Sequence, residues 1–65
     1  MLRTPAELAE QLGVPIATLS QWRWRSVGPA FVKIGRHVRY RDEEIEAWLT
    51  QQTRGGDAID RAATS

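Results

Sequence analysis

The sequence predicts a small, mainly α-helical domain with one β-hairpin, whose elements follow one another in the order α-α-β-β-α. Three segments carry apolar residues at helical spacing, and residues typical of helix ends flank them. Two short runs rich in β-branched and aromatic residues are separated only by Gly35-Arg36-His37, as in a hairpin. The 65 residues include no cysteine, so apolar packing alone must hold one small core.

The first helix is expected over Pro5 to Leu12. Thr4 is a favourable N-cap, Pro5 suits the first helical position, and Glu7 completes a T-x-x-E capping box. Two leucines four residues apart form its apolar face. Gly13 supplies the left-handed residue that ends the helix.

A second helix is expected from about Ile16 to Arg25. Ile16, Leu19 and Trp22 recur every three residues and form one apolar stripe. Pro29 ends the helical region, because proline cannot continue a helix and disfavours helical geometry at the residue before it.

The hairpin strands are expected over Phe31 to Ile34 and Val38 to Arg41, with Gly35 at the turn position that needs an unusual φ. Strand alternation places both arginines of the second strand outside. It leaves three apolar residues to close the core: Ile34, Val38 and Tyr40.

Asp42 is expected to cap a third helix, with further acidic residues in the first turn beside the positive end of the helix dipole. The helix should fray around Thr53, and its buried stripe comprises Ile45, Trp48 and Leu49. Residues 1–54 therefore form the folded domain. Residues 55–65 lack aromatic side chains and are mostly small or polar, which predicts a flexible C-terminal tail.

The first two helices have the spacing of a helix-turn-helix. Ala9 is small where the two helices approach, Gly13 lies four residues later in the turn, and Leu19 lies six residues further on. The remaining interior positions are apolar: Leu8, Leu12, Val14 and Trp22. A generic helical hairpin is the alternative, although it would tolerate many other patterns.

In a helix-turn-helix the second helix enters the major groove of DNA. Gln pairs with adenine, Arg pairs with guanine, and Ser or Thr reaches bases or phosphates. The same residue types also occupy any solvated helix face, which remains an alternative. The candidate contacts on this helix and at its end are Thr18, Ser20, Gln21, Arg23 and Arg25.

Trp24 lies about 200° around the second helix from Trp22. We expect Trp24 to cover the small core. An exposed Trp24 would instead contact a sugar-phosphate edge or a neighbouring protomer.

Charge is segregated along the chain, although the formal net charge is only +1. Residues 20–41 hold six Arg and Lys residues and no acid, whereas residues 1–19 carry −1 and residues 42–65 carry −4. Such a directional basic surface predicts a polyanionic partner. Chance clustering on a solvated face is the alternative.

The hairpin is then a wing that lies along DNA beside the second helix. Arg36 at its tip suits a narrow minor groove, where the negative potential is enhanced. We expect Lys33, Arg39 and Arg41 to face outward and meet phosphates, and His37 to share the exposed tip.

The segments "LRTPAELAEQLGVPIATLSQWR" and "GPAFVKIGRHVRYRDEEIEAWL" resemble the excisionase family, MerR-like winged helix-turn-helix domains of phage and mobile-element recombination directionality factors. The resemblance covers residues 2 to about 50. It implies sequence-specific binding to double-stranded DNA and, for phage members, DNA bending and contact with an integrase. Pro15 departs from the serine or threonine that this family usually has as N-cap, and Thr18 is the candidate substitute for its phosphate contact.

The expected function is therefore that of an excisionase that binds repeated attachment sites, self-associates head to tail on DNA and promotes integrase-mediated excision. Its expected location is the cytoplasm of a bacterial host, on DNA. A small prophage-type transcriptional regulator with the same fold is one alternative. A protein-interaction module without a DNA role is another, and it predicts that neutralising the basic hairpin leaves function intact.

The sequence gives no reason to expect catalysis, a cofactor or a small-molecule substrate. Tyr40 lies between two arginines and superficially resembles a tyrosine-recombinase nucleophile, but strand alternation places it on the inward face with Val38. Ser20, Ser26 and His37 show no triad pattern. With one histidine and no cysteine, the sequence lacks the ligands of a structural zinc site. No apolar run is long enough to predict a transmembrane helix.

Overall fold

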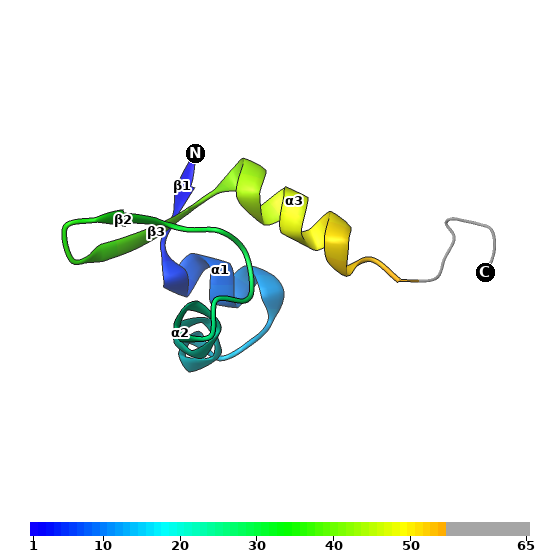
Figure 1. The fold of residues 1–65 in the computed structure, drawn as a ribbon, viewed down its shortest axis with the longest axis horizontal. Helices are drawn as coiled ribbons and strands as arrows, with labels where there is room; N and C mark the ends of the chain where they lie inside the picture. The colour runs from blue at the N-terminus through cyan, green and yellow to red at the C-terminus, as the bar shows by residue number, and fades with distance from the viewer. Residues whose placement is uncertain (55–65) are drawn as a thin grey trace.

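The computed structural model describes residues 1–54, which form three helices and a small three-stranded sheet (Figure 1). The predicted order α-α-β-β-α is confirmed, with one additional strand near the N-terminus. The tail predicted for residues 55–65 lies outside the described residues. In chain order the elements are β1 (Leu2–Arg3), α1 (Pro5–Leu12), α2 (Ile16–Trp24), β2 (Val32–Ile34), β3 (His37–Arg41) and α3 (Asp42–Gln52).

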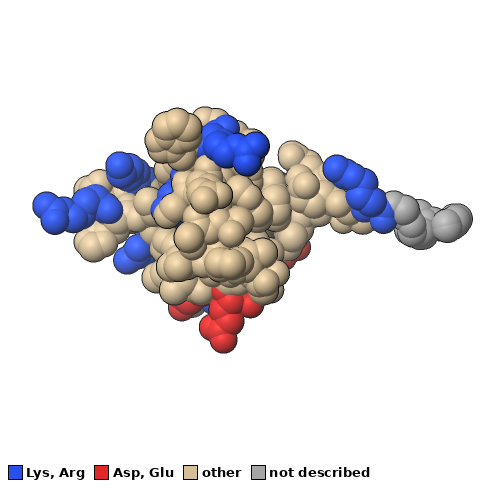
Figure 2. Space-filling model, turned by 90° about the horizontal axis from the view of Figure 1, so that it is seen from below, with Lys and Arg blue, Asp and Glu red and all other residues tan. Residues whose placement is uncertain are grey.

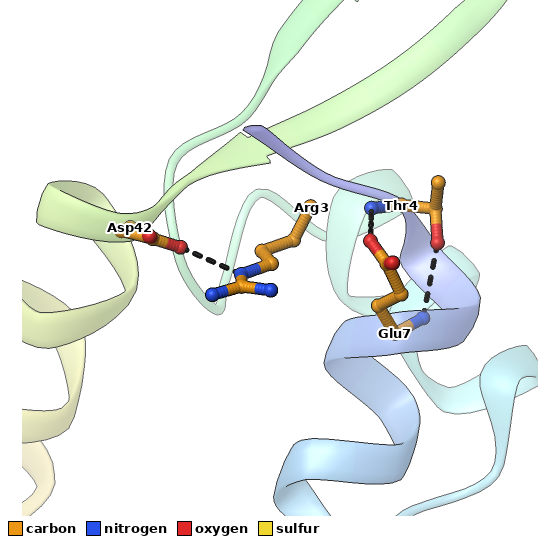
Figure 3. A network of polar contacts seen from close by, with 4 residues as sticks. All are labelled: Arg3, Thr4, Glu7 and Asp42. Carbon is orange, nitrogen blue, oxygen red and sulfur yellow. Dashed lines mark hydrogen bonds and ion pairs between the residues drawn. The ribbon is translucent and has the colours of Figure 1, made fainter. Parts of the chain in front are cut away.

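Helix α1 has the predicted bounds because local chemistry determines both of its ends. Thr4 Oγ1 accepts a hydrogen bond from the backbone N–H of Glu7 (3.1 Å), and Glu7 Oε1 accepts one from the backbone N–H of Thr4 (2.9 Å) (Figure 3). This reciprocal pair is the predicted capping box. Gly13 is left-handed, with φ 71° and ψ 32°, and its N–H donates to the carbonyls of the last turn. The chain therefore turns directly from α1 into α2.

Helix α2 ends at Trp24, one residue before the predicted end, with Arg25 as its C-cap. Its N-cap is Pro15, whose side chain makes no capping hydrogen bond. Ser26 then adopts a positive φ of 59°, which takes the chain out of the helical path.

The sheet is antiparallel with strand order β1-β3-β2. Ile34 pairs with His37, so the hairpin turn contains two residues, Gly35 and Arg36, and the prediction that His37 belongs to the turn is wrong. Gly35 has φ 61°, as predicted, and Arg36 has no positive φ. Positive φ at the first turn residue alone is the type II′ geometry, whose twist matches that of the flanking strands.

Strand β1 is absent from the sequence-based prediction. Leu2 pairs with Arg41 and Arg3 pairs with Tyr40, which places the N-terminal segment beside β3. Two residues carry no periodic pattern. The strand forms because the edge of β3 offers unpaired backbone groups, which are costly to leave without partners.

The core lies where α1, α2, β3 and α3 meet. Its buried residues are Leu8, Ala9, Leu19, Tyr40 and Ile45, with Leu12, Val14, Trp22, Val38 and Leu49 packed around them. Two expected core residues lie outside it, since Ile16 is 53% exposed and Ile34 is 52% exposed. Ile16 is the first residue of α2, and Ile34 lies next to the hairpin turn at the end of the projecting wing. Ile16 is therefore too peripheral to reach the core. Ile34 pairs with His37 and so lies on the sheet face opposite Val38 and Tyr40, directed away from the core.

The loop between α2 and β2 packs against Trp22. The ring centroids of Trp22 and Trp48 lie 5.3 Å apart at an interplanar angle of 44°, which connects α2 with α3. Gly28 adopts φ 84°, and a Cβ at this position would lie only 2.8 Å from Cε3 of Trp22. Glycine is therefore required here both by conformation and by space, while the adjacent Pro29 is buried.

Helix α3 follows β3 without an intervening loop (Figure 1). The prediction that Asp42 is its N-cap is wrong by one position, because Arg41 is the N-cap and Asp42 is the first helical residue. The carboxylate of Asp42 instead accepts a hydrogen bond from Arg3 Nε at 2.9 Å (Figure 3), and its backbone N–H donates to the carbonyl of Met1 at 3.0 Å. Thr53 is the C-cap, where fraying was expected. Within residues 1–54 every helix is too short or too polar to span a membrane.

Candidate nucleic-acid interface

Helix α2 has one exposed side, which we call the outer face of α2. Leu19 on the opposite side is fully buried, which orients the helix. Residues three or four positions apart share a helix face, so the exposed residues form one stripe directed away from the core. The outer face comprises Ala17, Ser20, Gln21 and Trp24.

Ser20 and Gln21, two of the predicted contacts, are therefore accessible on the outer face. Thr18 is half-buried at its flank, and Arg25 is exposed at the C-cap. The structure thus brings Ser20 and Gln21 together for contact with a surface laid along α2, whereas Thr18 reaches such a surface only from the side.

Trp24 departs from the sequence-based expectation. It was expected to cover the core, but 88% of it is exposed. Trp24 lies on the side of α2 opposite the buried stripe, and this angular position is the signal from which its exposure could have been predicted. Trp22 packs against the core in its place, and Trp48 packs against Trp22.

Arg23 is half-buried and connects α2 with the sheet. It donates hydrogen bonds to the hydroxyl of Tyr40 (2.9 Å) and to Ser20 Oγ (3.0 Å), and its guanidinium lies 6.0 Å from the centroid of the Phe31 ring. Tyr40 is 1% exposed, so this bond satisfies a hydroxyl that would otherwise be costly to bury. Arg23 therefore holds α2 against β3 in addition to carrying charge.

The hairpin tip consists of Gly35 and Arg36, and the Arg36 side chain is exposed. His37 is also exposed, on the first residue of β3. Because the type II′ turn is tight, Arg36 lies at the extreme end of the hairpin. This geometry places Arg36 where the sequence predicted it.

The basic residues of the strands divide between the two faces of the hairpin. Lys33 pairs with Val38, and directly paired residues of antiparallel strands point to the same face, so Lys33 shares the face of the sheet that carries Val38 and Tyr40. Arg39 and Arg41 lie on the opposite face. Lys33, Arg39 and Arg41 were expected to share the outward face of the hairpin. For Lys33 this expectation is wrong, because Lys33 lies on the other face, although its side chain is exposed.

The two arginines of β3 also differ in exposure. Arg39 is half-buried and donates to the carbonyl of Val38 at 2.7 Å, whereas Arg41 is exposed at the junction with α3. Arg41 is therefore the more accessible of the two.

Charge is segregated in space as it is along the chain. Figure 2 shows Lys and Arg side chains around the hairpin end and along one edge of the molecule, with Asp and Glu side chains at the opposite edge. Among residues 1–54 the only ion pair joins Arg3 to Asp42. The hydrogen bond that Arg3 donates to the Asp42 carboxylate, together with the negative charge of that carboxylate, raises the pKa of Arg3 above its ordinary value. Within the described residues, the cations of α2 and the hairpin are thus not neutralised by a carboxylate in direct contact.

This arrangement combines an exposed helix face, a projecting hairpin and a shared positive charge, which suits a long polyanion rather than a small ligand. No curated protein matches the chain, and no solved structure matches it. A model described as a helix-turn-helix domain matches residues 4–53, which include α1, α2, the hairpin and α3. The chain therefore belongs to the helix-turn-helix domain family, a family that includes excisionase-like DNA-binding proteins.

Proposed function

We propose that this protein is an excisionase, which binds and bends double-stranded DNA and promotes integrase-mediated excision of a phage or mobile element. Membership of the helix-turn-helix family indicates DNA binding. The resemblance of residues 2–50 to excisionases supports the more specific role. The observation that carries the proposal is the basic segment of residues 20–41, which holds six Arg and Lys residues and no acid and includes the exposed tip residue Arg36.

In the proposed complex α2 lies in the major groove and the hairpin tip lies in the adjacent minor groove. Gln21 and Ser20 on the outer face are suited to base edges, since an amide pairs with adenine and a hydroxyl donates or accepts. Arg36 is suited to the minor groove, where a cation gains most when the groove is narrow. Arg25 and Arg41 are exposed and suited to phosphates.

Bending supplies the link to recombination. Bending a short site costs on the order of 1–6 kcal/mol, which several protomers on repeated attachment sites share. A bent duplex brings distant integrase sites together. In this proposal the copies associate head to tail on DNA and an integrase is the protein partner.

A salt-dependent binding experiment tests the DNA-binding part of the proposal. The logarithm of affinity for an attachment-site duplex should fall linearly with the logarithm of salt concentration, with a slope of about −0.9 for each phosphate contact. Arg36→Ala should weaken binding and reduce the magnitude of that slope by about 1. Arg54→Ala is the matched control, because Arg54 is exposed beyond the end of α3, and its affinity should be unchanged. An Arg36→Ala protein that binds as tightly as the wild type would remove the minor-groove assignment.

Excision and bending distinguish an excisionase from a transcriptional regulator with the same fold. Circularly permuted duplexes should show a bend centred on the bound site, and excision by the cognate integrase should require the protein. Specific binding to a promoter, with no bend and no effect on excision, would contradict the excisionase assignment and support the regulator.

A further inference from the structure

Trp24 is exposed at a position where the fold does not use it. It is the last residue of α2, and 88% of it is accessible. The other two tryptophans pack against each other, and Trp22 also packs against the core, so Trp24 is the one tryptophan whose removal leaves those contacts in place. A large aromatic group at this place is therefore explained more readily by a contact outside the protein.

A shallow groove of about 400 Å³ lies beside Trp24, between α2 and the hairpin. Its wall on the α2 side carries Trp24 and Ser20, and its wall on the hairpin side carries Lys33 and Val38. Arg23 and Phe31 complete the lining, which includes two cations, a hydroxyl and apolar groups but no carboxylate. We call this feature the Trp24 groove.

The direction of Lys33 gives the groove its charge. Lys33 shares the sheet face of Val38, so its ammonium group belongs to the side of the hairpin that faces α2. Arg23 adds a guanidinium that is anchored to Tyr40 and Ser20 and has further N–H groups that donate to no other described residue. An occupant of the groove must therefore combine negative charge with an apolar surface.

We propose that the Trp24 groove receives the sugar-phosphate backbone of double-stranded DNA, with the indole ring of Trp24 against a deoxyribose and Lys33 at a phosphate. This inference rests on the proposed DNA-binding function. When α2 occupies the major groove and the hairpin tip occupies the neighbouring minor groove, the strand that separates the two grooves passes between α2 and the hairpin. Deoxyribose offers apolar C–H groups and the phosphates carry the charge, which matches both parts of the lining.

The length of α2 agrees with this placement. Nine residues span about 13 Å at 1.5 Å per residue, close to the major-groove width of about 12 Å. With the N-terminal end of α2 directed at the bases, its last residue reaches the edge of the groove. Trp24 is thus at the backbone rather than at the groove floor.

A backbone contact has two signatures that separate it from a base contact. Its contribution is the same for every DNA sequence, because sugars and phosphates do not vary. The contribution of Trp24 should also leave the salt dependence unchanged, since an indole ring releases no counterion, whereas the contribution of Lys33 should alter it.

The test measures the affinity of each variant for an attachment-site duplex and for an unrelated duplex of equal length, over a range of salt concentrations. Trp24→Ala should weaken binding to both duplexes by the same factor, on the order of tenfold, with an unchanged salt slope. Lys33→Gln should weaken both and reduce the magnitude of the slope by about 1. Leu2→Ala, which removes an exposed apolar side chain from β1, is the control and should bind as the wild type does.

A spectroscopic readout uses the native residue. The tryptophan emission that acrylamide quenches in the wild type but not in Trp24→Phe comes from Trp24. Addition of either duplex should protect this emission from quenching. Far-UV circular dichroism should show that Trp24→Ala and Trp24→Phe keep the fold, since the residue is exposed.

Three outcomes overturn the inference. Unchanged affinity of Trp24→Ala for both duplexes excludes a DNA contact by this residue. A loss confined to the attachment-site duplex indicates a base contact instead. Wild-type protein that binds neither duplex at low salt overturns the proposed function as well, which distinguishes that failure from the first two.

Discussion

Gly28→Ala tests whether the loop between α2 and β2 depends on its close contact with the Trp22 ring. Gly28 has φ 84°, where an L-residue is strained by roughly 1–2 kcal/mol. The added Cβ would lie 2.8 Å from Cε3, 3.2 Å from Cβ and 3.3 Å from Cδ2 of Trp22. Relief of this overlap requires movement of a ring that packs against Trp48, and such overpacking typically costs about 1–3 kcal/mol.

The lower unfolded-state entropy of alanine offsets about 0.4–1 kcal/mol of these costs. The expected net loss in the free energy of unfolding is therefore about 1–4.5 kcal/mol. A domain of this size has only about 3–5 kcal/mol in total. Urea unfolding followed by circular dichroism should show Gly28→Ala partly unfolded even without denaturant.

Gly13→Ala is the matched control for the Gly28 prediction. Gly13 has a similar φ of 71°, but no heavy atom lies within 4 Å of the position its Cβ would take. Gly13→Ala should therefore show the backbone strain alone, about 1 kcal/mol after the entropy offset. Equal losses in the two variants would refute the role assigned to the Trp22 contact.

Three further experiments test local interactions, each by urea unfolding at 25 °C. Thr4→Ala removes the capping-box hydroxyl and should cost about 1 kcal/mol; no loss would contradict the capping role. Tyr40→Phe removes the acceptor of the Arg23 hydrogen bond and should cost about 0.5–1.5 kcal/mol while retaining the core packing; an equally stable variant would show that the bond is not net stabilising. A double-mutant cycle with Arg3→Gln and Asp42→Asn should give a coupling below about 1 kcal/mol, because the pair is partly exposed, and a larger value would be inconsistent with that exposure.

The sequence predicts the elements whose ends are set by local chemistry. Thr4, Glu7 and Gly13 define α1 correctly because their capping interactions involve only neighbouring residues. Gly35 likewise marks the hairpin turn, since its positive φ is a local requirement. These features need no knowledge of the tertiary structure.

Features set by distant contacts could not be predicted in the same way. Leu2 and Arg3 form a strand only because β3 lies beside them. Ile34 has an apolar side chain, but its pairing with His37 places it on the sheet face opposite Val38 and Tyr40, so it is exposed. In the candidate site, the residue types were predictable, but the anchoring of Arg23 by Tyr40 and the groove-facing direction of Lys33 follow from packing and strand register.

The direct passage from β3 into α3 has a mechanical consequence. Arg41 ends the strand and is also the N-cap of the helix, so no loop uncouples the two elements. The bonds of Asp42 to Met1 and Arg3 brace this junction from a second segment of the chain. A DNA duplex that binds the hairpin would therefore also fix the orientation of the acidic helix α3. If copies bind repeated sites as proposed, the helical repeat of the DNA would fix the angle between successive α3 helices.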